Sequence, residues 1–409
     1  MTQTRIQSLQ AFHVGIKLKQ PIRHASYSRT QNDTLIIRCQ LSDGSVGWGE
    51  GLPRPYVTGE TIGSAIQQLE TSDFAAISEC DFSDFMSVAN SVSDWQLTQC
   101  DPDTSQTQGP QSGGCDPHQS GFGNTVRCAL ELAVFDAATR SAGVSLSRII
   151  QDLAEPLGLK QLSESVRYSG VVTSSAGRFA QLRSALKMRI FGFDAIKVKV
   201  GHPEICDPKL LAAVRSMIGQ KIDVRIDANE GWTPDIAAQQ IHELLPFGIS
   251  CVEQPLSDSH RLHLPALRRE VGVPIMLDES LCSISDANEA VLAKSCDAFN
   301  IRLSKCGGIM SSLQLMNIAK ANGLFVQLGC LVGETGILSA AARHFACSVG
   351  PIRYFEGSYD RFVTADPLTR EDCTFRYGGL GKAIEGHGLG ITVQEADVHR
   401  LAVRTWRCL

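Results

Sequence analysis

The sequence contains no apolar run of the roughly 18 residues that a helix needs to span a bilayer. Its opening segment alternates polar and apolar side chains and lacks the apolar core of a signal peptide. The net charge is −5 over 409 residues, which gives no reason to expect nucleic acid or an anionic membrane as a partner. These absences predict a soluble cytoplasmic protein that binds neither nucleic acid nor membranes.

The sequence also lacks Cys-X-X-Cys pairs and His/Cys clusters with the spacing of a zinc site, although it contains 14 cysteines. Most of these cysteines lie in apolar segments, as Cys128 and Cys251 do, and buried thiols behave as small hydrophobic side chains. We therefore expect free, buried cysteines. A local disulfide between Cys100 and Cys115, which flank a loop-like stretch, is the one alternative.

The first part of the chain has the pattern of a small α+β domain. Residues 35–39 and 46–50 alternate in the manner of two strands joined by a tight turn, and helical patterns follow. Residues 101–123 are rich in Gln, Ser, Gly and Pro and contain almost nothing to bury, which predicts a flexible insertion. We predict an N-terminal α+β capping domain over residues 1–140 that contains this insertion.

From about residue 165 the sequence alternates between short β-branched segments and helical segments, the pattern of βα units with a parallel sheet. The expected strands are residues 166–172, 195–200, 223–229, 250–255, 274–280, 298–305, 325–330 and 352–358. Eight strands with seven intervening helices suit a closed barrel better than an open sheet. We predict a modified (β/α)8 TIM-type barrel of the (β/α)7β kind over residues 141–360, and residues 361–409 return to complete the capping domain.

Charged residues stand near the C-terminal ends of five expected strands, although barrel strands are buried on both faces and should be almost wholly apolar. These residues are Lys197 and Lys199 on one strand, then Asp227, Glu253, Asp278 and Lys305 on the next four. From Lys199 onward they are separated by 28, 26, 25 and 27 residues, about one βα unit each. The spacing places them together on the C-terminal rim, where barrel enzymes carry their active sites.

Three of these residues are carboxylates on consecutive strands, and converging carboxylates repel each other unless a cation neutralises them. Oxygen ligands favour a hard ion over zinc. We therefore predict a site for Mg²⁺ or Mn²⁺ formed by Asp227, Glu253 and Asp278. The neighbouring polar residues expected to support these ligands are Asn229, Gln254 and Glu279.

The lysines suit proton transfer. Lys197 and Lys199 are separated by one residue, so both point into the barrel mouth. Two ammonium groups close to each other and to a divalent ion destabilise each other's charge, which allows a lysine to act as a general base. Lys305 is expected across the metal, so that a substrate carboxylate would lie between two proton carriers. The alternative, purely structural ion pairing, would leave three carboxylates with less positive charge than they need.

These motifs resemble those of the enolase superfamily, in its muconate-lactonising subgroup (the mandelate racemase/muconate lactonizing enzyme group). The ordered set is Lys197-Val-Lys199, Asp227-Ala-Asn229, Glu253-Gln-Pro255, Asp278-Glu-Ser280 and Lys305-Cys-Gly-Gly308, with Gly47-Trp-Gly-Glu50, Tyr56–Glu60 and Gly388-Leu-Gly390 resembling its capping domain. The resemblance implies metal ligation by the three carboxylates and an acid/base pair of Lys199 and Lys305. It also implies that Lys197 binds the substrate carboxylate.

The resemblance further implies an isomerase that abstracts the α-proton of a small carboxylate substrate to give a metal-stabilised enediolate. A racemase or epimerase of amino-acid derivatives and a muconate-type cycloisomerase both fit. The alternatives are a syn-dehydratase similar to o-succinylbenzoate synthase, a Schiff-base aldolase acting through Lys305, and a non-catalytic barrel. A homo-oligomer is compatible with the sequence.

Substrate contacts are expected from two closing loops and from the end of the eighth strand. The resemblance implies loops near residues 24–29 and 53–59, and the expected contacts are His24, Tyr27, Tyr56 and Glu356. Dipeptide epimerases of the subgroup usually carry Asp-X-Asp after the eighth strand to hold the α-ammonium group. The sequence Glu356-Gly-Ser358 departs from that pattern, and Arg302 stands where relatives often have lysine. These departures leave the predicted proton abstraction intact but do not identify the substrate.

Overall fold

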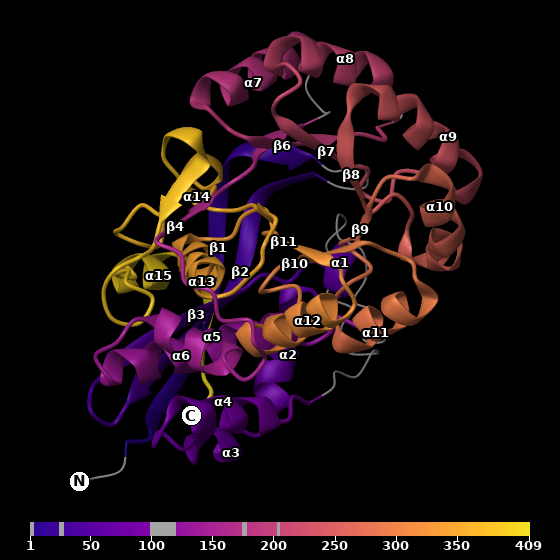
Figure 1. Ribbon diagram of the computed structural model, residues 1–409. Helices are drawn as coiled ribbons and strands as arrows, with labels where there is room; N and C mark the ends of the chain where they lie inside the picture. Colours follow the sequence, from indigo (N-terminus) through magenta and orange to yellow (C-terminus); the bar gives the residue numbers. More distant parts are fainter. Residues whose placement is uncertain (1–3, 24–27, 99–119, 174–177, 203–204) are drawn as a thin grey trace.

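The computed structural model describes residues 4–23, 28–98, 120–173, 178–202 and 205–409 (Figure 1). His24, Tyr27, Cys100 and Cys115 lie outside these ranges, as does most of the predicted insertion. The twelve cysteines within the described ranges are all free, as expected. In the same ranges, no helix is both long and apolar enough to cross a membrane.

Eight parallel strands form a curled sheet at the centre of the molecule (Figure 1). They are β5 (Gly170–Val172), β6 (Ala195–Lys199), β7 (Asp223–Asp227), β8 (Ile249–Glu253), β9 (Ile275–Leu277), β10 (Ala298–Ile301), β11 (Phe325–Leu328) and β12 (Tyr354–Phe355). Each strand pairs with the next in chain order. The backbone N–H of Ser169 donates to the carbonyl oxygen of Phe355 at 2.8 Å, which joins the first strand to the last.

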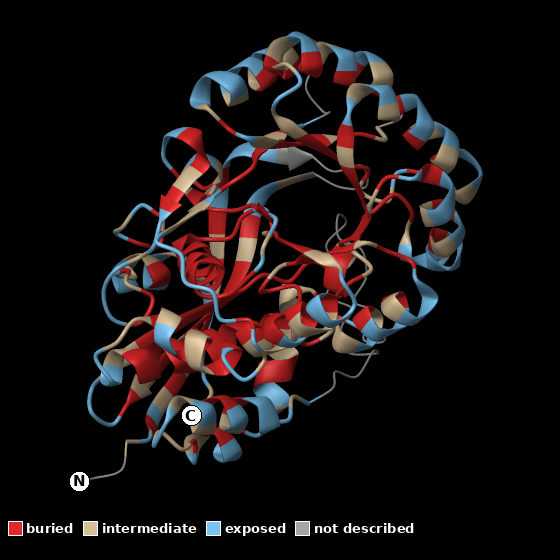
Figure 2. Ribbon diagram, in the orientation of Figure 1, coloured by how far each residue is buried: buried red, intermediate tan, exposed pale blue. Residues whose placement is uncertain are grey.

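One helix connects each strand to the next. These helices are α7 (Arg178–Phe191), α8 (Asp207–Ile218), α9 (Pro234–Leu244), α10 (Leu264–Val271), α11 (Ile284–Ala293), α12 (Ile309–Ala321) and α13 (Gly336–Ser348). Proline in the first turn of α8, α9 and α10 suits the helix start, where its missing N–H costs nothing. Helices α8 to α10 expose one face, whereas α13 is buried all round against the capping domain (Figure 2). The predicted (β/α)7β fold class is confirmed.

The capping domain contains an antiparallel sheet of β14 (Ala402–Arg407), β1 (Ile6–Arg23), β2 (Ser28–Leu41) and β3 (Val46–Gly51), in that order. Its helices are α1 (Pro55–Thr58), α2 (Ile62–Thr71), α3 (Ala75–Ser78), α4 (Phe85–Asp94), α5 (Asn124–Ser141) and α6 (Leu146–Ala154). Helix α5 packs directly on β3, where a Cβ atom at Gly49 would overlap the carbonyl oxygen of Ala129. The close approach therefore requires glycine at this position.

The first barrel strand differs from the prediction. The sequence predicts one strand over residues 166–172, but the structure divides it into β4 (Ser165–Arg167) and β5. Strand β4 pairs antiparallel with β13 (Leu380–Lys382) outside the barrel. An apolar β-branched run is compatible with either sheet, so only the partner strand from the C-terminal segment determines the division.

Three buried glutamates of the capping domain bind the N-termini of helices, where backbone N–H groups lack partners within the helix. Glu50 accepts hydrogen bonds from the N–H groups of Thr335 and Leu338 at the start of α13. Glu60 accepts hydrogen bonds from backbone N–H groups at the start of α5. Glu131 does the same at the start of α12. Burial raises the pKa of Glu50 and Glu60 to about 7 and that of Glu131 to about 8.

The Glu50→Gln variant should respond less to pH than the wild type. Since the pKa of Glu50 in the folded protein, about 7, exceeds the pKa of a solvated glutamate, about 4.3, the folded state binds more protons between these values. Stability therefore falls as the pH rises through this window, by at most about 1.4 kcal/mol per pH unit for one proton. Glutamine takes up no proton, so the free energy of unfolding, measured with urea from pH 5 to 7, should fall less steeply. Equal slopes would contradict the raised pKa.

Candidate active site

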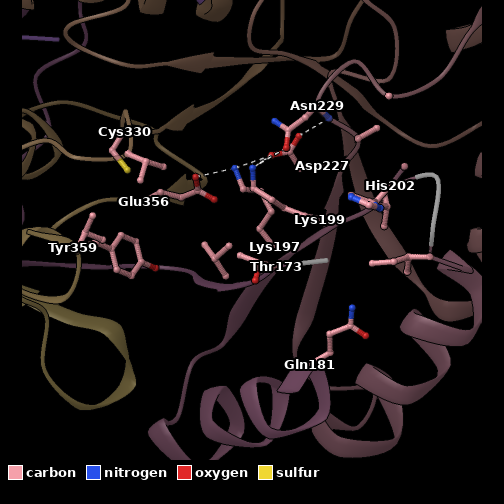
Figure 3. A pocket seen from close by; sticks show the side chains of 18 of the residues that line it. Thr173, Gln181, Lys197, Lys199, His202, Asp227, Asn229, Cys330, Glu356 and Tyr359 are labelled. Atoms are coloured by element: carbon pink, nitrogen blue, oxygen red, sulfur yellow. Dashed lines mark hydrogen bonds and ion pairs between the residues drawn. The ribbon is translucent and has the colours of Figure 1, made fainter. Parts of the chain in front are cut away.

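A large cleft lies at the C-terminal rim of the barrel and is bordered by the capping domain. Its volume is about 1480 Å³. Side chains from both domains line it, among them Lys19, Tyr56, Lys199, Asn229, Arg302 and Tyr359. Figure 3 shows Lys197, Lys199, Asp227 and Glu356 close together on one wall. Tyr56, an expected substrate contact, thus lies at the cleft.

Lys197 and Lys199 project from β6 toward the same carboxylate, as their spacing predicts. The ammonium group of Lys197 lies 3.3 Å from Asp227 Oδ2, 3.1 Å from Glu253 Oε1 and 2.9 Å from Glu356 Oε2. Lys199 Nζ lies 3.9 Å from Asp227 Oδ2 and donates to Asn229 Oδ1 at 2.6 Å. The Lys199 side chain is 30% exposed, against 5% for Lys197. Both lysines line the cleft, and Lys199 is the more exposed of the two.

The charge state of Lys197 differs from the expectation drawn from paired lysines. Burial disfavours its ammonium group, but the charges of Glu253, Glu356 and Asp227 outweigh burial and raise its pKa. Lys197 therefore stays protonated, which suits binding of an anionic group. The three carboxylates around Lys197, rather than the neighbouring Lys199, therefore determine the direction of its pKa shift.

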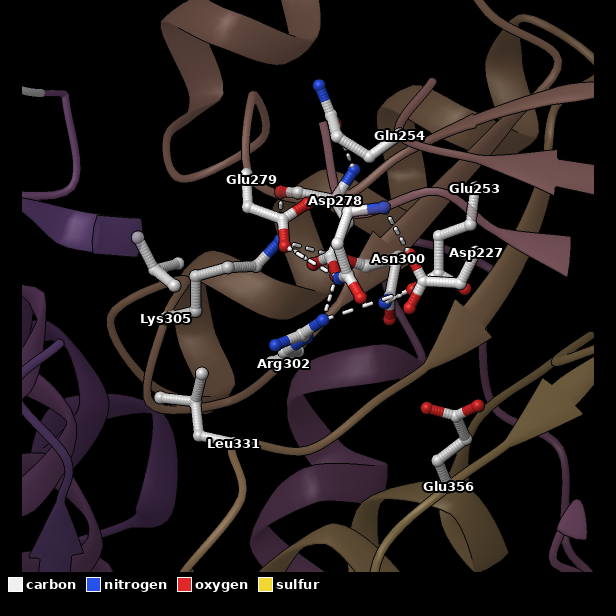
Figure 4. A network of polar contacts seen from close by, with 12 residues as sticks. Asp227, Glu253, Gln254, Asp278, Glu279, Asn300, Arg302, Lys305, Leu331 and Glu356 are labelled. Atoms are coloured by element: carbon white, nitrogen blue, oxygen red, sulfur yellow. Dashed lines mark hydrogen bonds and ion pairs between the residues drawn. The ribbon is translucent and has the colours of Figure 1, made fainter. Parts of the chain in front are cut away.

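Asp227, Glu253 and Asp278 stand at or just beyond the ends of β7, β8 and β9, and all three are buried (Figure 4). Asp227 and Glu253 are register partners, whereas Asp278 follows the last residue of its strand. Arg302 forms an ion pair with Asp278 and lies 3.9 Å from Glu253 Oε1. Together with Lys197, it supplies positive charge beside these carboxylates. We expected that ion pairing would leave the three carboxylates with too little positive charge, and this was wrong because the expectation did not include Arg302.

Within the described ranges, no three His, Cys, Asp or Glu side chains are grouped as a metal site, since Lys197 and Arg302 contact the carboxylates instead. The three side chains nevertheless offer oxygen donors only, and a hard cation prefers such donors. Asp227 Oδ2 is buried and accepts no hydrogen bond. The residues therefore fit Mg²⁺ in donor type, and Lys197 and Arg302 contact the same carboxylates.

Lys305 lies in the turn after β10 and is completely buried (Figure 4). Its ammonium group donates to the carbonyl oxygens of Asp278 and Asn300, at 2.6 and 2.9 Å, and to Asp278 Oδ1 at 3.0 Å. Burial lowers its pKa, which favours the neutral amine that a general base requires. Lys305 thus contacts Asp278, but it is not among the residues that line the cleft, where the sequence predicts it across the metal from Lys199.

The three predicted supporting residues hold the strand ends. Asn229 donates its backbone N–H to Asp227 Oδ1 at 3.0 Å and its side-chain N–H to Glu279 Oε1 at 3.3 Å. Gln254 Oε1 accepts from the backbone N–H of Asp278 at 2.8 Å. Burial, with the charge of Asp227, raises the pKa of Glu279 to about 8. Asn229 and Gln254 have φ values of 43° and 36°, a left-handed conformation that non-glycine residues rarely adopt.

Glu356 stands after β12 at the cleft, but its carboxylate is already bound. Arg225 and Lys197 each form an ion pair with it. Their charges outweigh the opposing effect of burial and lower the pKa of Glu356. Arg225 is fully buried and was not predicted as a site residue. Its signal in the sequence is a charge two residues before Asp227, on the same side of the strand.

Two further polar residues of the barrel interior were also missed. Asn300 Nδ2 and Gln327 Nε2 donate to Glu253, at 2.9 and 3.2 Å. Both stand in strands whose other residues are apolar, which is the signal that could have found them. These uncharged amide side chains orient Glu253 through the hydrogen bonds that they donate.

One family model and several known proteins are similar to this chain. Residues 180–397, more than half of the chain, match the family described as enolase C-terminal domain-like. A D-Ala-D/L-Ala epimerase of Cytophaga hutchinsonii is 27% identical over 393 residues, which cover 95% of this chain and 96% of that protein. A chloromuconate cycloisomerase of Cupriavidus necator is 28% identical over 276 residues, 67% of this chain and 72% of that protein.

A third relative is similar along the whole chain. The N-succinyl-L-Arg/Lys racemase of Bacillus cereus is 25% identical over 410 residues, 98% of each protein. A crystal structure of an N-succinyl Arg/Lys racemase from that organism superposes with a TM-score of 0.83 at 22% identity, and covers 98% of this chain and 99% of the other. The similarity in fold therefore extends over both the barrel and the capping domain.

Proposed function

The chain belongs to the enolase superfamily and is an isomerase, and on this premise we propose that it racemises or epimerises an amino-acid derivative whose α-nitrogen is acylated. The observation that carries the choice of substrate is the state of Glu356. Its carboxylate is neutralised by Arg225 and Lys197. Glu356 therefore offers no free negative charge to an α-ammonium group.

The residue two positions further on is also engaged. The hydroxyl of Ser358 is hydrogen-bonded to the hydroxyl of Tyr168 at 2.9 Å and accepts from Arg343 at 3.2 Å. A protonated amine placed beside Ser358 would lose its hydration without gaining an anionic partner from Glu356 or Ser358, which is unfavourable. An amide nitrogen is neutral and requires no such partner. The arrangement supports N-acyl amino acids over dipeptides with a free amino terminus.

The proposed proton transfer uses two lysines. Lys197 stays charged and binds the substrate carboxylate, while Lys199, the more exposed lysine, takes or returns the α-proton from one face. Lys305, whose pKa is lowered by burial, serves the other face. A divalent cation held by Asp227, Glu253 and Asp278 would act as a Lewis acid on the substrate carboxylate. The cleft wall around Tyr56 and Tyr359 would exclude water.

Deuterium exchange tests this proposal. The protein is incubated with Mg²⁺ in D₂O and, separately, with each enantiomer of N-acetyl and N-succinyl amino acids and with dipeptides that have a free amino terminus. We expect deuterium at the α-carbon and racemisation of N-acylated substrates, read by mass spectrometry and chiral chromatography. Exchange confined to dipeptides would overturn the choice of substrate, and no exchange in any of these compounds would overturn racemisation.

A muconate-type cycloisomerase is the second candidate, and the position of Lys305 favours it. Lys305 is bound by three oxygen acceptors and does not line the cleft, whereas Lys199 does. Cycloisomerisation can proceed with one lysine. Incubation with cis,cis-muconate and chloromuconates, followed by ultraviolet absorbance, distinguishes the two candidates because only a cycloisomerase consumes these compounds.

A further inference from the structure

Helix α5 of the capping domain begins beside the turn that carries Lys305. The side-chain amide of Asn124, the first residue of α5, donates to the carbonyl oxygen of Lys305 at 2.6 Å. The same amide donates to the carbonyl oxygen of Cys282 at 2.9 Å. One side chain thus bridges the turn after β10 to the loop that follows Asp278.

A second residue of α5 binds the start of α12, directly after the same turn. Glu131 lies two helical turns after Asn124, hence on the same face, and accepts hydrogen bonds from the backbone N–H groups of Ile309 and Met310. The turn approaches α5 so closely that a Cβ atom at Gly307 would lie 2.8 Å from Asn124 Oδ1. Gly307 has φ +84°, so glycine is required here for conformation as well as space. The backbone of the Lys305 turn is therefore held by the capping domain.

The start of α5 is itself fixed to the wall of the cleft. Glu60 accepts hydrogen bonds from the N–H groups of Gly123 and Thr125, each at 3.0 Å, and from the Thr125 hydroxyl at 2.7 Å. Glu60 follows the short helix α1 that carries Tyr56. The cleft wall and the Lys305 turn are thus connected through the start of helix α5.

We propose that Asn124 is a positioning residue for Lys305. By holding the Lys305 carbonyl oxygen and that of Cys282 together, it sets where the amine stands relative to the substrate α-carbon. This inference rests on the proposed function, in which each lysine serves one face of the substrate. Because Asn124 has no contact with Lys199 in the described structure, its loss should affect one enantiomer only. Small displacements of a catalytic group of about 1 Å cost up to about 10²-fold in rate.

The test uses Asn124→Asp, which keeps the size of the side chain but replaces the amide donor by a carboxylate that repels both carbonyl oxygens. Each enantiomer of the N-acetyl and N-succinyl amino acids is incubated with the full-length variant and Mg²⁺ in D₂O. The face that Lys305 serves is identified from the enantiomer that loses exchange in Lys305→Met. The matched control is Asn322→Ala, because the side chain of Asn322 is exposed and donates to its own helix α12, at Ile318 O.

We expect Asn124→Asp to slow exchange of the Lys305-side enantiomer at least tenfold and to change the other enantiomer less than about threefold. Asn322→Ala should leave both unchanged. An equal loss for both enantiomers, or no loss, would overturn the positioning role, since a structural effect acts on both faces. If Asn124→Asp does not fold, Asn124→Ala provides the same comparison. Absence of exchange in the wild type would instead overturn the proposed function.

Discussion

Replacement of Lys199 by alanine should abolish racemisation, with a loss of at least about 10³-fold, while the protein stays folded. General acid–base catalysis contributes about 10²–10⁴-fold, and here the same residue acts in both directions of the reaction. The fold should survive because Lys199 is part exposed, and Asp227 keeps its ion pair with Lys197. Chiral chromatography of an accepted N-acyl amino acid measures the loss, and urea denaturation verifies the fold.

The control for this experiment is Lys187→Ala, which removes an exposed lysine on helix α7, outside the residues that line the cleft. It should retain wild-type activity. Lys199→Ala should still exchange the enantiomer that Lys305 serves, so residual one-sided exchange is the expected signature. Normal racemisation by Lys199→Ala would refute the assignment of two proton carriers.

Removal of divalent cations should abolish exchange, and Glu253→Gln should have the same effect while the protein stays folded. Glu253 is completely buried and is oriented by Asn300 and Gln327. Glutamine preserves its shape but removes the charge that a hard cation requires. Lys197 keeps its ion pairs with Asp227 and Glu356, so the stability of the variant should stay close to that of the wild type.

A readout independent of activity accompanies this prediction. A ligand at 100 times its dissociation constant stabilises the folded state by about 2.7 kcal/mol, so Mg²⁺ should raise the unfolding temperature of the wild type. Glu253→Gln should lose this increase. Glu243→Gln should keep it, since Glu243 is exposed on α9, where its carboxylate accepts a hydrogen bond from Gln239. Activity that survives chelation, together with an unfolding temperature insensitive to Mg²⁺, would contradict the proposed metal site.

The sequence alone determined the fold class and the gathering of Lys197, Lys199, Asp227, Glu253 and Asp278 at one rim of the barrel. The reason is periodicity, because one βα unit recurs about every 26 residues along this part of the chain and consecutive parallel strands end at the same edge. Residues that the repeat places at equivalent positions must lie near one another. No long-range distance has to be known for this conclusion.

Only the tertiary structure decided which charges these residues contact. Arg302 and Arg225 neutralise Asp278 and Glu356, and the direction of each long side chain depends on packing across the barrel. Lys305 lies in a turn rather than a strand, so the alternation of a strand does not predict its position. Its turn is held by Asn124, 181 residues earlier in the chain. Such a contact follows from domain packing, for which a local sequence pattern carries no signal.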